Sequence, residues 1–226
     1  KLLHMKTNTW LFKMFLCLPM SFFAQQGGDQ DAFYLEDQLF FSVGYTSLKD
    51  TPNQFQQNGF SYGVSLGFIK DIPFNKRRNF GMALGAGYAY HRYNHNLLHD
   101  KSSFQVTDDY KSNLFSYSSL EIPFEFRWRT STYDKFKFWR VYSGVTVSYI
   151  LNNRAKYRSE QKTQVLRNLT EIERLQYGVT LSLGYNTWNF YANYALTSLY
   201  KEGVVNAAGE LIEMKPLRLG LIFYML

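Results

Sequence analysis

Apolar residues along this chain alternate with small or polar ones in a period of two. In 60–68 every even position is aromatic or aliphatic, and every odd position is Ser or Gly. Successive side chains of a β-strand point to opposite faces, so such a segment has one apolar face and one small, polar face. The apolar face is long and aromatic, which favours a barrel wall in contact with lipid over a soluble sandwich.

Eight segments carry this pattern, and each is expected to form a strand. They are 39–45, 60–68, 80–90, 120–128, 139–149, 175–183, 188–196 and 217–225. Pro123 cannot donate to a ladder, so we expect a bulge or kink in the fourth segment. The sequence therefore predicts an all-β, eight-stranded, antiparallel up-and-down transmembrane barrel. A soluble lipocalin-like barrel is the alternative fold.

The connections between these segments alternate in length. The long ones are 47–58, 94–113, 153–170 and 200–215, and the shorter ones are 70–79, 130–137 and 186–187. Outer-membrane barrels have long extracellular loops and short periplasmic turns, so we expect a bacterial outer-membrane location with both termini periplasmic. Eight strands enclose an interior that side chains can fill, and no open pore is expected.

The N-terminal residues have the composition of a secretory signal peptide. Met5 reads as the natural start, and the apolar stretch that follows Lys6 ends at Ala24. The stretch is too short for a comfortable membrane helix, which favours a cleaved signal over an uncleaved anchor. Cys17, the only cysteine, falls within it, so the mature chain would offer no thiol chemistry. We divide the chain into upstream residues 1–4 within a signal peptide 1–24, a periplasmic segment 25–37 and a barrel 38–226.

Average hydropathy hides the barrel pattern. The mean value is −0.31, but apolar and polar positions of a transmembrane strand cancel in any window. Without Lys1, Lys6 and Lys13 of the expected signal peptide, 22 basic and 18 acidic residues leave a net charge of +4. This excess could favour an anionic lipid surface, but we favour scattered loop charges. The connection 153–170 concentrates cations that could contact lipopolysaccharide phosphates or an acidic partner, namely Arg154, Lys156, Arg158, Lys162 and Arg167. A solvated loop is the alternative, and no nucleic-acid partner is expected.

Charged residues also fall on the predicted interior faces. They are Glu121, Glu125, Arg127, Arg140, Arg174 and Arg218. An unpaired charge in a narrow lumen costs several kcal/mol, so these groups are expected to pair into a network that plugs and stiffens the barrel. A proton- or ion-conducting path is the alternative.

Three histidines deserve comparison with metal and catalytic sites. His91, His95 and His99 recur at intervals of four beside Asp100, which makes them weak candidates for zinc. We favour polar residues at the extracellular rim, with no metal and no cofactor. A lipid-modifying rim enzyme would need Ser, His and a carboxylate converging at one edge, and no spacing here supports that arrangement. The sequence therefore predicts a protein that is not an enzyme.

The last strand ends in a pattern similar to the signal read by the barrel-assembly machinery. Its polar residue is Arg218, its glycine is Gly220, and its spaced large residues are Phe223 and Met225, although Leu226 follows. With the signal-peptide ending and the strand 119–127, the chain resembles the PorT-like outer-membrane barrels of Bacteroidetes, small barrels of the OmpX and OmpA type. Founding members of that family are implicated in type IX secretion.

This resemblance implies a structural or accessory barrel without catalytic residues. Its expected partners are outer-membrane lipid and lipopolysaccharide, the barrel-assembly machinery, and envelope or secretion proteins. A small passive channel is the second hypothesis for the function, and a rim enzyme acting on lipid is the third.

Overall fold

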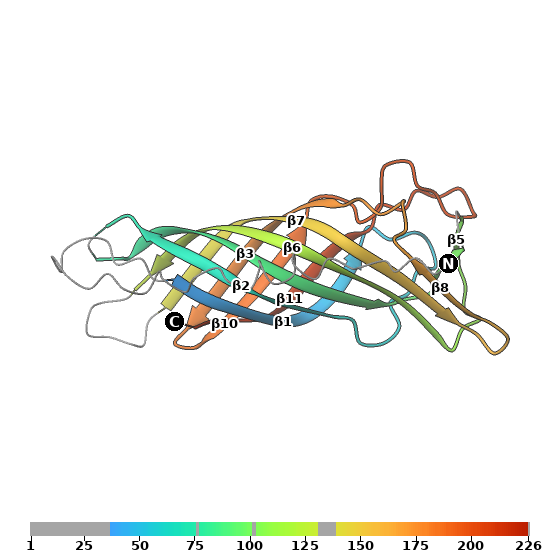
Figure 1. Ribbon diagram of the computed structural model, residues 1–226, viewed down its shortest axis with the longest axis horizontal. Coiled ribbons are helices and arrows are strands. Elements are labelled where there is room, and N and C mark those ends of the chain that lie inside the picture. Colours follow the sequence, from blue (N-terminus) through green and yellow to red (C-terminus); the bar gives the residue numbers. More distant parts are fainter. Residues whose placement is uncertain (1–36, 76, 101–102, 131–138, 226) are drawn as a thin grey trace, which may run out of the picture. The chain divides into compact units, whose positions relative to one another are not determined.

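The computed structural model describes residues 37–75, 77–100, 103–130 and 139–225, and their arrangement is drawn in Figure 1. The expected signal peptide 1–24, most of the segment 25–37 and most of the connection 130–137 lie outside the described residues, as does Leu226. The described part contains no helix long and apolar enough to cross a membrane.

Eight strands form the wall. They are β1 (Asp37–Lys49), β2 (Tyr62–Pro73), β3 (Phe80–Asn94), β6 (Ser112–Arg129), β7 (Trp139–Arg158), β9 (Leu175–Tyr185), β10 (Trp188–Ala195) and β11 (Lys215–Met225). Neighbours are antiparallel, in the order β6-β3-β2-β1-β11-β10-β9-β7, and pairing of β6 with β7 closes the ring. The predicted closed, eight-stranded antiparallel barrel is confirmed.

The strands extend further than the apolar pattern predicted. β6 and β7 have 18 and 20 residues, whereas about 9–11 residues suffice to cross a membrane. The expectation of a loop over 153–170 was wrong at its start, because β7 continues to Arg158 and pairs with β8 (Thr163–Arg167). A hairpin of β4 (Leu97–Asp100) and β5 (Ser103–Val106) fills part of the third connection. Figure 1 places β5 and β8 at the same end of the barrel.

The outward positions of the wall form an apolar belt, as expected for a surface that faces lipid. Leu66, Phe68, Phe126, Leu183 and Phe190 are more than half exposed. Phe60 is also exposed, but β2 begins only at Tyr62, so the second strand starts later than its alternation suggested.

The bulge expected at Pro123 lies elsewhere in the β6–β7 ladder. Pro123 keeps its place opposite Thr146 in the β6–β7 ladder, and the register shift falls between Ser118 and Ser119. On the other side of β6, pairing with β3 is interrupted around Pro123 and resumes in the same register. The missing N–H donor therefore opens a gap in one ladder without adding a residue to the strand.

Apolar side chains are buried in two places. Within the barrel, Phe40, Ile69, Ala83 and Ile222 pack together. A larger cluster lies where the long connections meet and includes Leu97, Phe104, Phe115, Tyr200 and Met214. We call the region built on this second cluster the cap, comprising 50–61, 95–100, 103–106, 159–174 and 196–214. The cap gives the long connections a hydrophobic core of their own.

Candidate functional site

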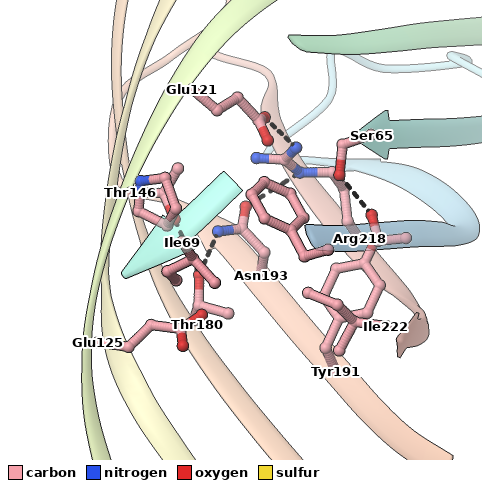
Figure 2. Close-up of a pocket in the computed structure, with 13 residues that line it drawn as sticks. Ser65, Ile69, Glu121, Glu125, Thr146, Thr180, Tyr191, Asn193, Arg218 and Ile222 are labelled. Atoms are coloured by element: carbon pink, nitrogen blue, oxygen red, sulfur yellow. Dashed lines mark hydrogen bonds and ion pairs between the residues drawn. The ribbon is translucent and has the colours of Figure 1, made fainter. Parts of the chain in front are cut away.

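Three side chains meet in the middle of the lumen, as Figure 2 shows in part. Arg218 of β11 donates to Glu121 of β6 at 2.6 Å, and its side chain is only 12 % exposed. Nε2 of His91, from β3, lies 3.1 Å from the same guanidinium nitrogen. A guanidinium can only donate, so His91 accepts through Nε2. The three groups come from three separate strands, and their contacts connect these strands across the interior.

Hydrogen bonds extend this central cluster from β11 along the neighbouring strands. Arg218 also donates to Asn193 of β10 at 3.0 Å, and Asn193 donates to Thr180 of β9 at 2.7 Å. The hydroxyl oxygens of Thr180 and of Thr146, on β7, are 3.2 Å apart and share a hydrogen bond. This chain of contacts, drawn in part in Figure 2, follows the neighbouring strands β11, β10, β9 and β7 around the wall.

Two small cavities flank the Glu121–Arg218 pair. One, of about 50 Å³, is lined by both residues and by Phe40, Ile69 and Ile222. The other, of about 20 Å³, is lined by the same pair together with Tyr117 and Gln176. Sites for small-molecule substrates occupy about 300–1,000 Å³, so these cavities have room for a few water molecules and not for a substrate.

A second cluster fills the end of the barrel where the short turns lie. Arg127 is fully buried and contacts Glu125 at 2.9 Å, Gln38 at 2.9 Å and Asp71 at 3.6 Å. Its guanidinium also lies over the rings of Tyr142 and Tyr224, at 4.6 and 4.9 Å from their centroids. The buried guanidinium is thus surrounded by carboxylates and by aromatic rings, and these are the two kinds of partner that a desolvated arginine requires.

Asp71 is the member of this cluster that the alternating pattern missed. It is 1 % exposed and pairs with both Arg127 and Arg129. The predicted strand ended at 68, whereas β2 continues to Pro73 with Ile72 facing outward and Asp71 inward. Ile72, which keeps the outward parity of Leu66 and Phe68, was the available signal.

The predicted interior charges are distributed unequally. Glu121 and Arg218 meet in the central cluster, and Glu125 and Arg127 meet in the second. Arg140 is half-buried at the short-turn end, opposite Arg129 in the β6–β7 ladder. The expectation for Arg174 was wrong, because this residue is exposed just before β9 begins. An even-numbered residue of β9 would point into the lumen, but Arg174 precedes the strand and does not belong to the wall.

The cap is held together by hydrogen bonds between connections that are far apart in sequence. Asn96 donates to the Gln54 carbonyl at 2.9 Å and accepts from the Gln56 N–H at 2.7 Å. The Ala207 N–H donates to the Phe104 carbonyl at 2.7 Å. Glu210 accepts from the side chains of both Asn53 and Asn206. These hydrogen bonds link different connections, or two residues of the same connection, so the cap is a single folded unit.

His95 and His99 are buried in this cap and not at an open rim. Their ring centroids lie 5.9 Å apart, and His99 Nε2 is 2.9 Å from the Tyr200 hydroxyl. Burial lowers the pKa of His95 to about 4 and that of His99 to about 3, so both are neutral at pH 7. His91 belongs to the lumen cluster instead. Among the described residues, no three potential ligands lie close enough to hold a metal ion.

The residues of the expected assembly signal lie on β11 with different surroundings. Arg218 points into the lumen, and Gly220 lies opposite Gly44 of β1. Phe223 packs against Trp188, with ring centroids 5.6 Å apart, and Met225 is 47 % exposed. Recognition of these residues by the assembly machinery stays a prediction.

A match to a family model agrees with the barrel. A family model described as outer membrane protein beta-barrel domain matches residues 23–201. No curated protein matches the chain at a significant level. Two solved structures of Ail, the attachment invasion locus protein of Yersinia pestis, align with 83 % of this chain and 97 % of theirs at 13 % identity. One, in complex with the heparin analogue sucrose octasulfate, gives a TM-score of 0.39, and the other gives 0.35. Because the family model covers most of the sequence, this chain belongs to the outer membrane protein β-barrel domain family.

Proposed function

We propose that this protein is a sealed, non-enzymatic barrel that serves a structural or accessory role and contacts envelope or secretion proteins through its cap. The observation that supports this most directly is the filling of the lumen by two charge clusters. The long connections, and with them the cap, lie on the extracellular side, and both termini are periplasmic, as is general for outer-membrane barrels.

The proposed partners follow from the resemblance to PorT-like barrels of Bacteroidetes. Strand 119–127 and the C-terminal pattern through Phe223 and Met225 carry that resemblance. A role beside type IX-like secretion components is the specific form of the proposal. The barrel-assembly machinery is the partner expected during insertion.

Conductance in planar bilayers separates a sealed barrel from a passive channel. The wild-type protein is expected to give no steady single-channel current, since Arg127 and Arg218 with their carboxylates occupy the lumen. The double variant Arg127→Ser/Arg218→Ser removes both cations and is expected to leak if it folds. Steady current through the wild-type protein would overturn the sealed barrel.

Partner contact is tested by photo-crosslinking from the cap in native membranes. Val205 and Leu211 face each other in a β-bridge and are 46 % and 54 % exposed. A photoreactive residue at either position is expected to capture a discrete envelope protein, whereas the same residue at Leu181 in the apolar belt should yield lipid adducts. Cap positions that yield no protein adduct would contradict the proposed contact.

The non-enzymatic part of the proposal is tested by lipid analysis. Substitution of His91, His95 and His99 by Gln is expected to leave lipid A and phospholipid profiles unchanged. A changed profile in cells whose barrel is still folded would support the lipid-modifying alternative.

A further inference from the structure

A bulge in β7 reverses which residues face outward. Leu120 of β6 lies opposite Tyr149, but Ser118 lies opposite Asn152, so β7 carries one extra residue at this point. A residue added to one strand shifts its alternation by one position. Odd-numbered residues up to Leu151 face outward, and beyond the bulge the even-numbered ones do. Arg154 and Lys156 therefore point away from the barrel.

The outward positions beyond the bulge are strongly cationic. Arg154 lies directly opposite Arg167 of β8. On its other side it lies opposite Ser116 of β6, which in turn lies opposite Arg92 of β3. Paired residues share a face of the sheet, so cations from three strands lie on one surface. We call Arg92, Arg154, Lys156, Arg158 and Arg167 the cationic ladder.

Nothing described on the protein neutralises this surface. In the part of the chain that the structure describes, no carboxylate is paired with a residue of the cationic ladder. Glu160, in the β7–β8 turn, pairs with Lys111 at 3.2 Å instead. The outward positions between the cations are all uncharged, namely Asn94, Ser112, Leu114, Ser116, Asn152, Thr163 and Val165. Like charges directly opposite each other destabilise a sheet, so Arg154 and Arg167 favour an anion between them.

The cationic ladder adjoins the apolar belt. Leu120, Tyr149 and Leu151 are 50 %, 45 % and 41 % exposed at the edge of that belt. Arg154 follows Leu151 by three residues, a distance of about 10 Å along the strand and less along the membrane normal, because strands are tilted. That depth corresponds to the headgroup layer. The cations face sideways from the wall, toward neighbouring lipid.

We infer that the cationic ladder binds the phosphate groups of lipopolysaccharide, with Arg154 and Arg167 holding one phosphate between them. Arginine is suited to this role, because its planar guanidinium donates two parallel hydrogen bonds to phosphate oxygens. Lys156 follows on the same face of β7, directly opposite Val165 of β8, so it adds a further cation beside the pair and Val165 adds an apolar contact. The site rests on the proposed extracellular position of the long connections.

Binding of purified lipopolysaccharide to the full chain in uncharged nanodiscs tests the site. The double variant Arg154→Gln/Arg167→Gln is expected to bind bis-phosphorylated lipopolysaccharide at least tenfold more weakly than the wild type. Arg77→Gln/Lys201→Gln also removes two exposed cations, at positions outside the ladder, and should bind as the wild type does. Dephosphorylated lipopolysaccharide and phosphatidylglycerol should bind weakly to all three proteins. Arg154→Lys/Arg167→Lys should bind with intermediate affinity, because charge remains while the paired donors are lost.

Three results would overturn the inference. They are unchanged affinity in the Arg154→Gln/Arg167→Gln variant, an equal loss in the control variant, and equal binding of phosphatidylglycerol. Heat-modifiable gel mobility verifies that each variant is folded. The assay uses purified protein, so it does not depend on the captured partner or on conductance, and a failure here is distinguishable from a failure of the proposed function.

Discussion

Gly67 of β2 and Gly87 of β3 lie directly opposite each other, and the ring of Phe40 covers both. A Cβ added at Gly87 would lie 2.6 Å from Phe40 Cζ, and one at Gly67 would overlap the Ala86 carbonyl oxygen. The aromatic ring therefore occupies the space that two side chains would otherwise need. This contact belongs to the apolar layer beside the central cavity.

Replacement of Gly87 by Val is expected to destabilise the barrel strongly. Overpacking of a filled core costs about 1–3 kcal/mol, and here the ring of Phe40 must move away from its partners. Heat-modifiable mobility and urea unfolding in lipid vesicles measure the loss. Ala86→Val is the matched control, because Ala86 is the adjacent residue and faces outward. Equal stability of the two variants would contradict the close packing described for Phe40.

Loss of one partner in the central ion pair is expected to cost more than loss of both. Arg218→Met leaves Glu121 buried without its cation, and uncompensated buried charges destabilise by about 3–5 kcal/mol. Arg218→Met/Glu121→Leu should recover much of that stability, because no buried charge remains. Unfolding in urea, followed by tryptophan fluorescence, compares the variants. If the single variant unfolds at the same urea concentration as the wild type, the pair does not brace the barrel.

The period of two was sufficient to predict the wall but not the limits of its strands. Alternation depends on local sequence, and every predicted segment overlaps a wall strand. Asp71 was missed because the predicted second strand stopped at 68, where the outward residues change from aromatic ones to Lys70. Strands that protrude beyond the lipid lose the apolar half of their pattern, so hydropathy alone cannot show where they end.

The bulge and the cap could not be predicted because both depend on contacts between distant segments. The extra residue at Leu151 is visible only against its partner strand, since Ser118 and Ser119 define the register. Arg154 and Arg167 were identified as loop cations, but their position opposite each other follows from the β7–β8 pairing. Similarly, His99 meets Tyr200 across 101 residues of sequence, a contact that the spacing of the histidines does not indicate.

Acidification is expected to loosen the cap. The pKa of His95 is about 4 and that of His99 about 3 in the folded protein, against an ordinary value of 6.5. Between pH 6.5 and the folded-state pKa values, the unfolded cap binds protons that the folded cap does not. The free energy of unfolding of the cap therefore falls as the pH falls below 6.5, and these histidines leave it constant above 6.5. The loss is about 1.4 kcal/mol per pH unit for each histidine.

The groups around these histidines do not offset the effect. His99 packs against Phe104, Phe115 and Tyr200, and burial raises the pKa of Tyr200, which therefore stays neutral across this range. Hydrogen exchange of β4 and β5, corrected for intrinsic rates, should increase between pH 7 and pH 5 in the wild type. His95→Gln/His99→Gln should show a smaller change. An identical pH dependence in both proteins would exclude these histidines as its cause.

Insertion of one glycine between Asn153 and Arg154 is expected to turn the cations of β7 toward the interior. The added residue takes the next outward place, so Arg154, Lys156 and Arg158 take the face now held by Asn153 and Ala155. Burying three cations in the cap is unfavourable, so the β7–β8 hairpin should lose its pairing and exchange amide hydrogens rapidly. Binding of lipopolysaccharide should fall at least as far as in Arg154→Gln/Arg167→Gln. Insertion of one glycine between Glu160 and Gln161, in the exposed turn of the same hairpin, is the control and should leave both properties intact. A folded insertion variant that binds lipopolysaccharide as the wild type does would show that binding does not require these cations to face outward.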